Sequence, residues 1–360
     1  MSLYDILTYT AILGMVIGGM DLILNNRFGI GVYFKDALLL IGDFCVAALG
    51  LLVITPALAQ AISPFASVVT KLGIDPAFIA SVFAADVGGY TLAVNLAADP
   101  EMGKFFGSIV CAMLGAGLIG LPIARGIISR EDDPFFMRGM LIGIISVPFG
   151  SLAGGLIAGF RAGAVLVNSV PVFVISALLA WGLWKIPEKM IRGCMFFSRV
   201  LEIGAVVGLI VGAISQLLGV ELLPGMMPIY DALGILFSMV IILIGMYPLL
   251  RLILRSLDKP LVKLADVTHL RTASLFGILI TSVNCFPAFK MYGEMDDRGK
   301  VLVSAWAVPM VATFGDLAAF TAAVEPGMLL PVISAKVISG VVCFAIARYF
   351  MKDIPCDRKT

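Results

Sequence analysis

Apolar runs long enough to cross a lipid bilayer recur along the whole chain, and they constrain its fold more than any other feature. A transmembrane helix needs about 20 consecutive, mostly apolar residues. Hydrophobic residues make up 60% of the chain and charged residues 14%, whereas charged residues make up about 25% of a typical soluble domain. Because lipid offers no partners to backbone N–H and C=O groups, such runs must form helices. The sequence therefore predicts an all-α polytopic membrane protein.

About nine of these runs are clean enough to be transmembrane helices. They cover residues 6–24, 37–62, 104–128, 135–160, 166–186, 194–219, 229–254, 301–324 and 328–350. Two other stretches, 63–98 and 259–294, are interrupted by polar and helix-breaking residues. We expect each of these two to be a broken, re-entrant hairpin that enters the membrane and returns to its own side.

The two halves of the chain share one order of elements. Aligning Pro64 with Pro260 also aligns Gly103-Lys104 with Gly299-Lys300 without a gap. The aligned spans are separated by an odd number of crossings, so we expect the two repeats to be inverted in the membrane. The predicted units are a first repeat at 1–160, a linking span at 161–193, a second repeat at 194–350 and a tail at 351–360.

The placement of the 25 lysines and arginines supports this topology. Nearly all lie in the connectors of one side or in the C-terminal tail; the exceptions are Lys71, Lys104, Arg161 and Lys336. Positively charged connectors stay in the cytoplasm. We therefore expect an N-terminus outside and a C-terminus in the cytoplasm of a bacterium, with the protein in the inner membrane.

Each predicted hairpin holds a helix break with polar residues at membrane depth. In the first, Asp86 is followed by Gly88 and Gly89; in the second, Asn284 stands three residues before Pro287. Proline lacks the N–H and clashes with the carbonyl one turn earlier, so the backbone must kink or open there. Opened backbone in a bilayer persists where it is buried in protein or lines a polar cavity. Two such breaks in corresponding positions indicate a transporter's binding site.

Carboxylates at membrane depth are functional candidates, because inserting one costs about 2.5–3.5 kcal/mol. Asp86 lies beside two helix-weakening glycines, and Asp316 lies deep in its span after Pro309. Two aromatic residues flank the breaks symmetrically, either as a wall for a cation or as plain packing. The predicted substrate-binding residues are Asp86, Gly88, Gly89, Tyr90, Ser282, Asn284, Phe286 and Asp316.

Other polar residues have simpler interpretations. Glu202 can pair with Arg199 three residues earlier, and Lys336 can extend to the interface or neutralise an internal carboxylate. The sequence leaves the role of Asp43 open. The single histidine, His269, has no metal-ligand companion, and no nucleophilic triad or phosphate loop is present. We therefore expect no enzyme, metal or cofactor chemistry and no nucleic-acid partner.

Several local motifs resemble those of the ethanolamine-utilisation transporter family, EutH, and the resemblance extends over nearly the whole chain. They are Asp86-Val87-Gly88-Gly89, Ile186-Pro187-Glu188-Lys189-Met190, Leu222-Leu223-Pro224-Gly225, Asn284 with Pro287, Arg298-Gly299-Lys300 and Gly315-Asp316. The resemblance implies a permease that takes ethanolamine, a small primary ammonium, into the bacterial cytoplasm by facilitated or ion-coupled alternating access. Coupling to H+ or Na+, assembly into homo-oligomers and transport of another small polar solute remain open alternatives.

Overall fold

The computed structural model describes residues 2–82, 86–115, 124 and 127–355. Over these ranges the chain forms helices, with no β-strand among the described residues. Seven helices of this part are long and apolar enough to cross a membrane. They are Leu3–Ile23 (α1), Gly31–Lys71 (α2, η1 and α3), Arg130–Ile157 (η3 and α8), Ala162–Lys185 (α9), Pro187–Leu218 (α10), Ile229–Leu257 (within α11) and Pro326–Phe350 (η5 and α16). Each coincides with a predicted span, so the all-α polytopic fold is confirmed, while the full count of nine stays a prediction.

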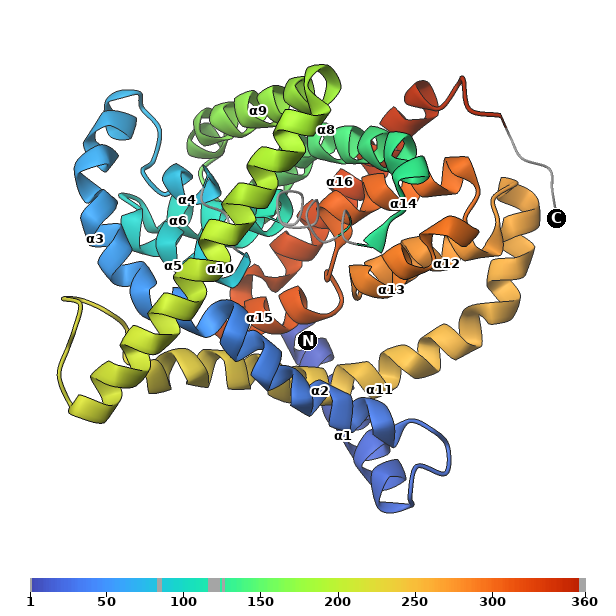
Figure 1. Cartoon of the computed structure of the whole chain (residues 1–360), viewed down its shortest axis with the longest axis horizontal. Helices are drawn as coiled ribbons and strands as arrows, with labels where there is room; N and C mark the ends of the chain where they lie inside the picture. The colour runs from blue at the N-terminus through green and yellow to red at the C-terminus, as the bar shows by residue number, and fades with distance from the viewer. Residues whose placement is uncertain (1, 83–85, 116–123, 125–126, 356–360) are drawn as a thin grey trace.

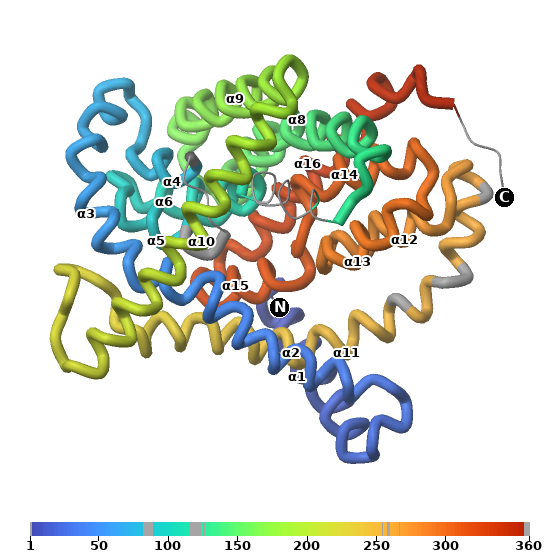
Figure 2. Tube along the Cα trace, in the orientation of Figure 1, coloured from blue at the N-terminus to red at the C-terminus, as the bar shows by residue number. Residues whose placement is uncertain are grey.

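The outer helices are longer than the sequence predicts. α11 spans Ile229–Thr268, and its 40 residues extend about 60 Å, about twice the hydrocarbon thickness of a bilayer. α2 (Gly31–Phe44), the π-helical turn η1 (Cys45–Leu49) and α3 (Gly50–Lys71) likewise follow one another without a loop. Figure 2 shows α11 running along the lower edge of the molecule and up to α12.

The two hairpins were expected to start at residues 63 and 259. Both positions instead lie inside a helix, α3 and α11 respectively, because each of these helices continues through a proline. Pro64 cannot donate to the Gln60 carbonyl, which would be its helical partner. The Ser63 hydroxyl donates to that carbonyl instead, at 2.8 Å. This substitute hydrogen bond explains how α3 passes the proline and ends only at Lys71.

The described part of the first predicted hairpin consists of α4 (Phe78–Val82) and α5 (Asp86–Leu96), and the intervening residues 83–85 lie outside the described residues. Its two ends are held together by one carboxylate: Asp75 accepts the backbone N–H of Ala77 and that of Asp99, each at 2.9 Å. The chain thus returns at Asp99 to the place from which it left at Asp75. This is the geometry expected of a segment that enters and turns back.

The second broken hairpin, α12 (Thr272–Thr281) and α13 (Cys285–Lys290), is closed in the same manner. Asp296 accepts the backbone N–H of Arg271 at 2.8 Å and that of Gly299 at 3.0 Å. Asp296 also caps the N-terminus of α14, so one carboxylate links the hairpin to the helix that follows it.

The predicted span 301–324 is not one helix. It is divided into α14 (Asp297–Met310) and α15 (Asp316–Val324), and the intervening Ala312 has a positive φ of 55°. The expectation of a continuous helix there was wrong, because the chain turns directly after Pro309. The counterpart span at 104–128 begins with α6 (Pro100–Lys104) and the π-helical η2 (Phe105–Val110), and much of its second half lies outside the described residues.

Two ion pairs connect the repeats reciprocally. The Lys104 ammonium lies 3.1 Å from Glu325, and the Lys300 ammonium lies 2.6 Å from Asp132. The two lysines are equivalent in the repeat alignment, and each pairs with the carboxylate that follows the other repeat's span. The start of each span therefore lies beside the end of the other. This antiparallel relation is the one expected of inverted repeats, although the repeat itself stays a prediction.

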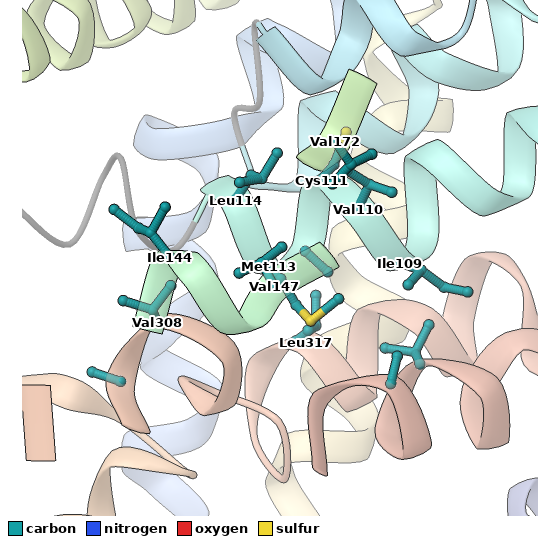
Figure 3. Close-up of a cluster of buried hydrophobic side chains, with 14 of the residues drawn as sticks. Ile109, Val110, Cys111, Met113, Leu114, Ile144, Val147, Val172, Val308 and Leu317 are labelled. Atoms are coloured by element: carbon teal, nitrogen blue, oxygen red, sulfur yellow. The ribbon is translucent and has the colours of Figure 1, made fainter. Parts of the chain in front are cut away.

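The largest buried core lies where the broken helices meet α8, α9 and α16. Figure 3 shows side chains of η2 and the following helix facing residues of α8, α9, α14 and α15; the labelled residues are Ile109, Val110, Cys111, Met113, Leu114, Ile144, Val147, Val172, Val308 and Leu317. Small residues on α8 permit this close packing. A Cβ at Gly150, for example, would lie 2.3 Å from the Ala335 carbonyl oxygen of α16. In Figure 1, α15 lies at the lower edge of this core, next to α11.

Candidate substrate site

The two helix breaks of the second repeat are joined by backbone hydrogen bonds. The Phe314 N–H donates to the Ser282 carbonyl at 2.9 Å, and the Ala312 N–H donates to the Thr281 carbonyl at 3.3 Å. Broken helices leave such groups without intrahelical partners, and lipid cannot satisfy them. The breaks at 282–284 and 311–315 thus stabilise each other at the centre of the packed helices.

Gly315 is required for this contact. A Cβ at position 315 would lie 2.6 Å from the Val283 carbonyl oxygen, much closer than carbon and oxygen atoms normally approach. The glycine lets the chain pass directly over the neighbouring break. The next residue, Asp316, is consequently placed at the start of α15, within reach of the other break.

Asn284 begins the second half of the hairpin. Its backbone is extended, and its side-chain oxygen accepts the Phe286 N–H at 2.9 Å as the N-cap of α13. Pro287 lies in the first turn of α13, where its missing N–H costs no hydrogen bond. The predicted opening of the backbone is therefore present, and it lies on the N-terminal side of the proline.

A cavity of about 570 Å³ adjoins the two breaks. Apolar side chains from α2, α10, α11, α13, α14 and α15 form most of its wall. The polar residues of the wall are Asp43, Ser198, Glu202, Asn284, Cys285 and Asp316. An apolar enclosure with a few convergent polar groups is typical of a small-molecule site.

Asp316 and Asn284 are brought together by Tyr247 of α11. The Tyr247 hydroxyl donates to Oδ1 of Asp316 at 3.1 Å and also interacts with the Asn284 side chain. The carboxylate lies at a helix N-terminus, where the helix dipole stabilises negative charge. A carboxylate, an amide and a phenol thus converge from three helices, and together they can accept and donate hydrogen bonds to an amino alcohol.

The other predicted residues of the second hairpin differ in position. Phe286 lies in the cavity wall with Asn284 and Asp316. Ser282 is buried, and its hydroxyl accepts the Trp306 Nε1–H at 2.8 Å. Ser282 therefore fixes the break against α14, a positioning contact that the sequence pattern does not reveal.

Tyr90, predicted from the first hairpin, lies next to the cavity wall. Its ring packs edge-on against Phe320 of that wall, with centroids 5.9 Å apart, and its hydroxyl donates to Glu325 at 3.3 Å. The adjacent Gly89 is buried in α5. The side chain of Asp86 and the surroundings of Gly88 lie outside the described residues, so their roles remain predictions.

The remaining polar candidates have structural partners. Glu202 pairs with Arg199 at 2.7 Å, as the sequence spacing indicates, and both side chains are exposed. Lys336 is 1% exposed, which excludes the interpretation that it extends to the membrane interface. Its ammonium contacts the carbonyl oxygens of Val311 at 3.2 Å and Ala112 at 3.4 Å.

Tyr247 is the residue of this site that sequence reasoning missed. It lies inside the apolar run 229–254 beside Pro248, and a tyrosine in such a run is commonly a packing residue. Its contact with Asp316 becomes apparent only when α11 is packed against α15.

Comparison with known proteins identifies relatives over the full length. A family model described as "Ethanolamine utilisation protein, EutH" matches residues 3–350. A protein of Listeria monocytogenes named "Probable ethanolamine permease EutH" is 37% identical and covers 97% of this chain and 94% of its own. Proteins of the same name from Salmonella typhimurium and Escherichia coli are each 32% identical, over 100% and 96% of this chain and 98% and 95% of their own. No solved structure matches the chain.

Proposed function

The chain belongs to the EutH family of ethanolamine utilisation proteins, and from that premise we propose that it takes ethanolamine into the bacterial cytoplasm across the inner membrane. The observation that carries the proposal is that Asp316 and Asn284 share one cavity wall, where the Tyr247 hydroxyl hydrogen-bonds to both side chains. Ethanolamine is a primary ammonium with one hydroxyl at neutral pH. Asp316 neutralises the ammonium, and Asn284 engages the hydroxyl as donor or acceptor.

The first hairpin contributes the other half of the proposed site. Asp86 supplies a second carboxylate from the start of α5, and Gly88 and Gly89 lie in the same first turns of that helix. Phe286 and Tyr90 provide aromatic faces for a cation. This arrangement places negative charge from both repeats around one small cation.

The cavity opens toward the cytoplasm in the proposed orientation. Asp43 and Glu202 of its wall lie near connectors that carry the cytoplasmic lysines and arginines, and the positive-inside rule assigns those connectors to the cytoplasm. The Lys104–Glu325 pair lies on the opposite side of the membrane in this orientation. Exchange of access then requires the hairpins and their core to move against the outer helices α3, α10 and α11.

Equilibrium binding to the purified protein tests the proposed recognition. Ethanolamine should bind, ethylene glycol should fail because it lacks the ammonium, and ethylamine should bind more weakly because it lacks the hydroxyl. Asp316→Asn should abolish binding. The matched control is Asp231→Asn at the exposed start of α11, which should bind as the wild type does. Equal binding of ethanolamine and ethylene glycol would contradict the assignment and favour another polar solute.

A further inference from the structure

Lys336 is a fully buried cation in the middle of a transmembrane helix. It lies in α16 (Leu329–Phe350), one residue after Ala335, which packs against the glycines of α8. Burying an ammonium in a bilayer is costly unless it is closely compensated. A lysine in this position therefore needs a reason other than packing.

The Lys336 ammonium contacts two main-chain carbonyl oxygens, those of Val311 and Ala112. Val311 follows the last residue of α14, so its carbonyl belongs to the end of a helix, where partial negative charge accumulates. Ala112 follows the π-helical η2 of the first repeat. The ammonium thus joins one span from each repeat, because it lies 3.2 Å from the Val311 carbonyl oxygen and 3.4 Å from the Ala112 carbonyl oxygen.

The same two residues form part of the substrate cavity. Val311 and Ala112 are both wall residues, together with Asp316. In transporters built from broken helices, unwound carbonyls and half-helix C-termini are the groups that coordinate a coupling Na+. Here a tethered ammonium contacts one such helix end, at Val311, together with the Ala112 carbonyl, beside the proposed substrate site.

We propose that Lys336 is a built-in cation that takes the position of a coupling Na+, so that uptake is independent of Na+. This inference rests on the proposed function and specifies its energetics. The substrate's own charge then drives uptake through the inside-negative potential. The carbonyls of Val311 and Ala112 form the site of the fixed cation, and its amine is held there by α16 without dissociating during the transport cycle.

Uptake into proteoliposomes tests the inference on the wild-type protein. With an inside-negative potential, ethanolamine uptake should differ less than twofold between external Na+ and external N-methylglucamine. An absolute requirement for Na+ would overturn the inference and leave ethanolamine transport intact. This uptake measurement needs no variant, so it does not depend on the folding of an altered chain.

Thermal unfolding of purified protein tests the site separately from transport. Lys336→Ala removes the ammonium and frees the carbonyls, so 100 mM Na+ should raise its Tm by several degrees relative to N-methylglucamine. The wild type and the matched control Arg348→Ala, which removes an exposed cation from the same helix, should show no Na+-dependent shift. Absence of a shift in folded Lys336→Ala would overturn the inference. If wild-type protein transported no ethanolamine, the proposed function would fail, but this Na+-dependent shift would still decide the role of Lys336.

Discussion

Gly315→Ala should disable transport by separating the two helix breaks. The added Cβ would lie 2.6 Å from the Val283 carbonyl oxygen, and ordinary contact begins at 3.4 Å, so the breaks must move apart by about 0.8 Å. The Phe314 to Ser282 hydrogen bond, now 2.9 Å, would then exceed the range of about 2.7–3.2 Å in which N–H···O bonds form. Overpacking of this kind costs about 1–3 kcal/mol of stability.

The functional consequence should exceed the loss of stability. Asp316 follows the substituted residue directly, so it moves with α15 away from Asn284. A displacement of about 1 Å in a binding constellation can reduce rates about 100-fold. We therefore expect ethanolamine uptake by Gly315→Ala to fall by about 10–100-fold, in protein that still purifies as a monodisperse species.

The matched control is Gly234→Ala in α11, where a Cβ would meet no described atom within 4 Å. Alanine is the better helix former by about 1 kcal/mol, so this variant should retain both stability and uptake. Proteoliposome uptake and thermal unfolding are measured in parallel for both variants. Unchanged uptake by Gly315→Ala would refute the view that contact between the breaks sets the site.

Three further substitutions have distinct expected outcomes. Tyr247→Phe removes a hydrogen bond to the charged Asp316 side chain, worth about 1.5–3 kcal/mol, and should raise the KM for uptake at least tenfold; an unchanged KM would exclude a role in positioning. Lys300→Met leaves the buried Asp132 without its ammonium, which costs about 3–5 kcal/mol, and should lower the Tm markedly. Lys104→Met breaks a pair that is partly exposed, with side-chain exposures of 41% and 23%, so the loss should be about 0–1 kcal/mol after solvent screening; equal Tm losses for the two lysine variants would contradict this ranking.

The sequence predicted the fold class because the dominant signal, apolar run length, is local. The break at 282–284 also follows local rules, since Asn284 and Pro287 are residues that start helices, whereas the break at 311–315 was not predicted. The position of Asp316 deep in its span could be predicted from the sequence. Its exact placement at the start of α15 could not, because the turn at 311–315 depends on hydrogen bonds from the other break.

The predicted helix boundaries were wrong where a neighbouring residue compensated for a local helix breaker. Pro64 predicts the end of a helix, yet the Ser63 hydroxyl satisfies the carbonyl that the proline leaves open. The contribution of Tyr247 depends on how two distant helices pack, which no local pattern encodes. The contacts of Lys336 with the carbonyls of Val311 and Ala112 could not be anticipated either, because the three residues lie far apart in the sequence.

Uptake of labelled ethanolamine into proteoliposomes shows whether Asp316 holds a transported ammonium. An inside-negative potential contributes about 2.3 kcal/mol per charge per 100 mV toward uptake of a cation. Wild-type protein should show saturable uptake that rises with the imposed potential, and Asp316→Asn should lose this uptake. Folded wild-type protein with uptake no faster than protein-free liposomes, or Asp316→Asn with undiminished uptake, would contradict this role of Asp316.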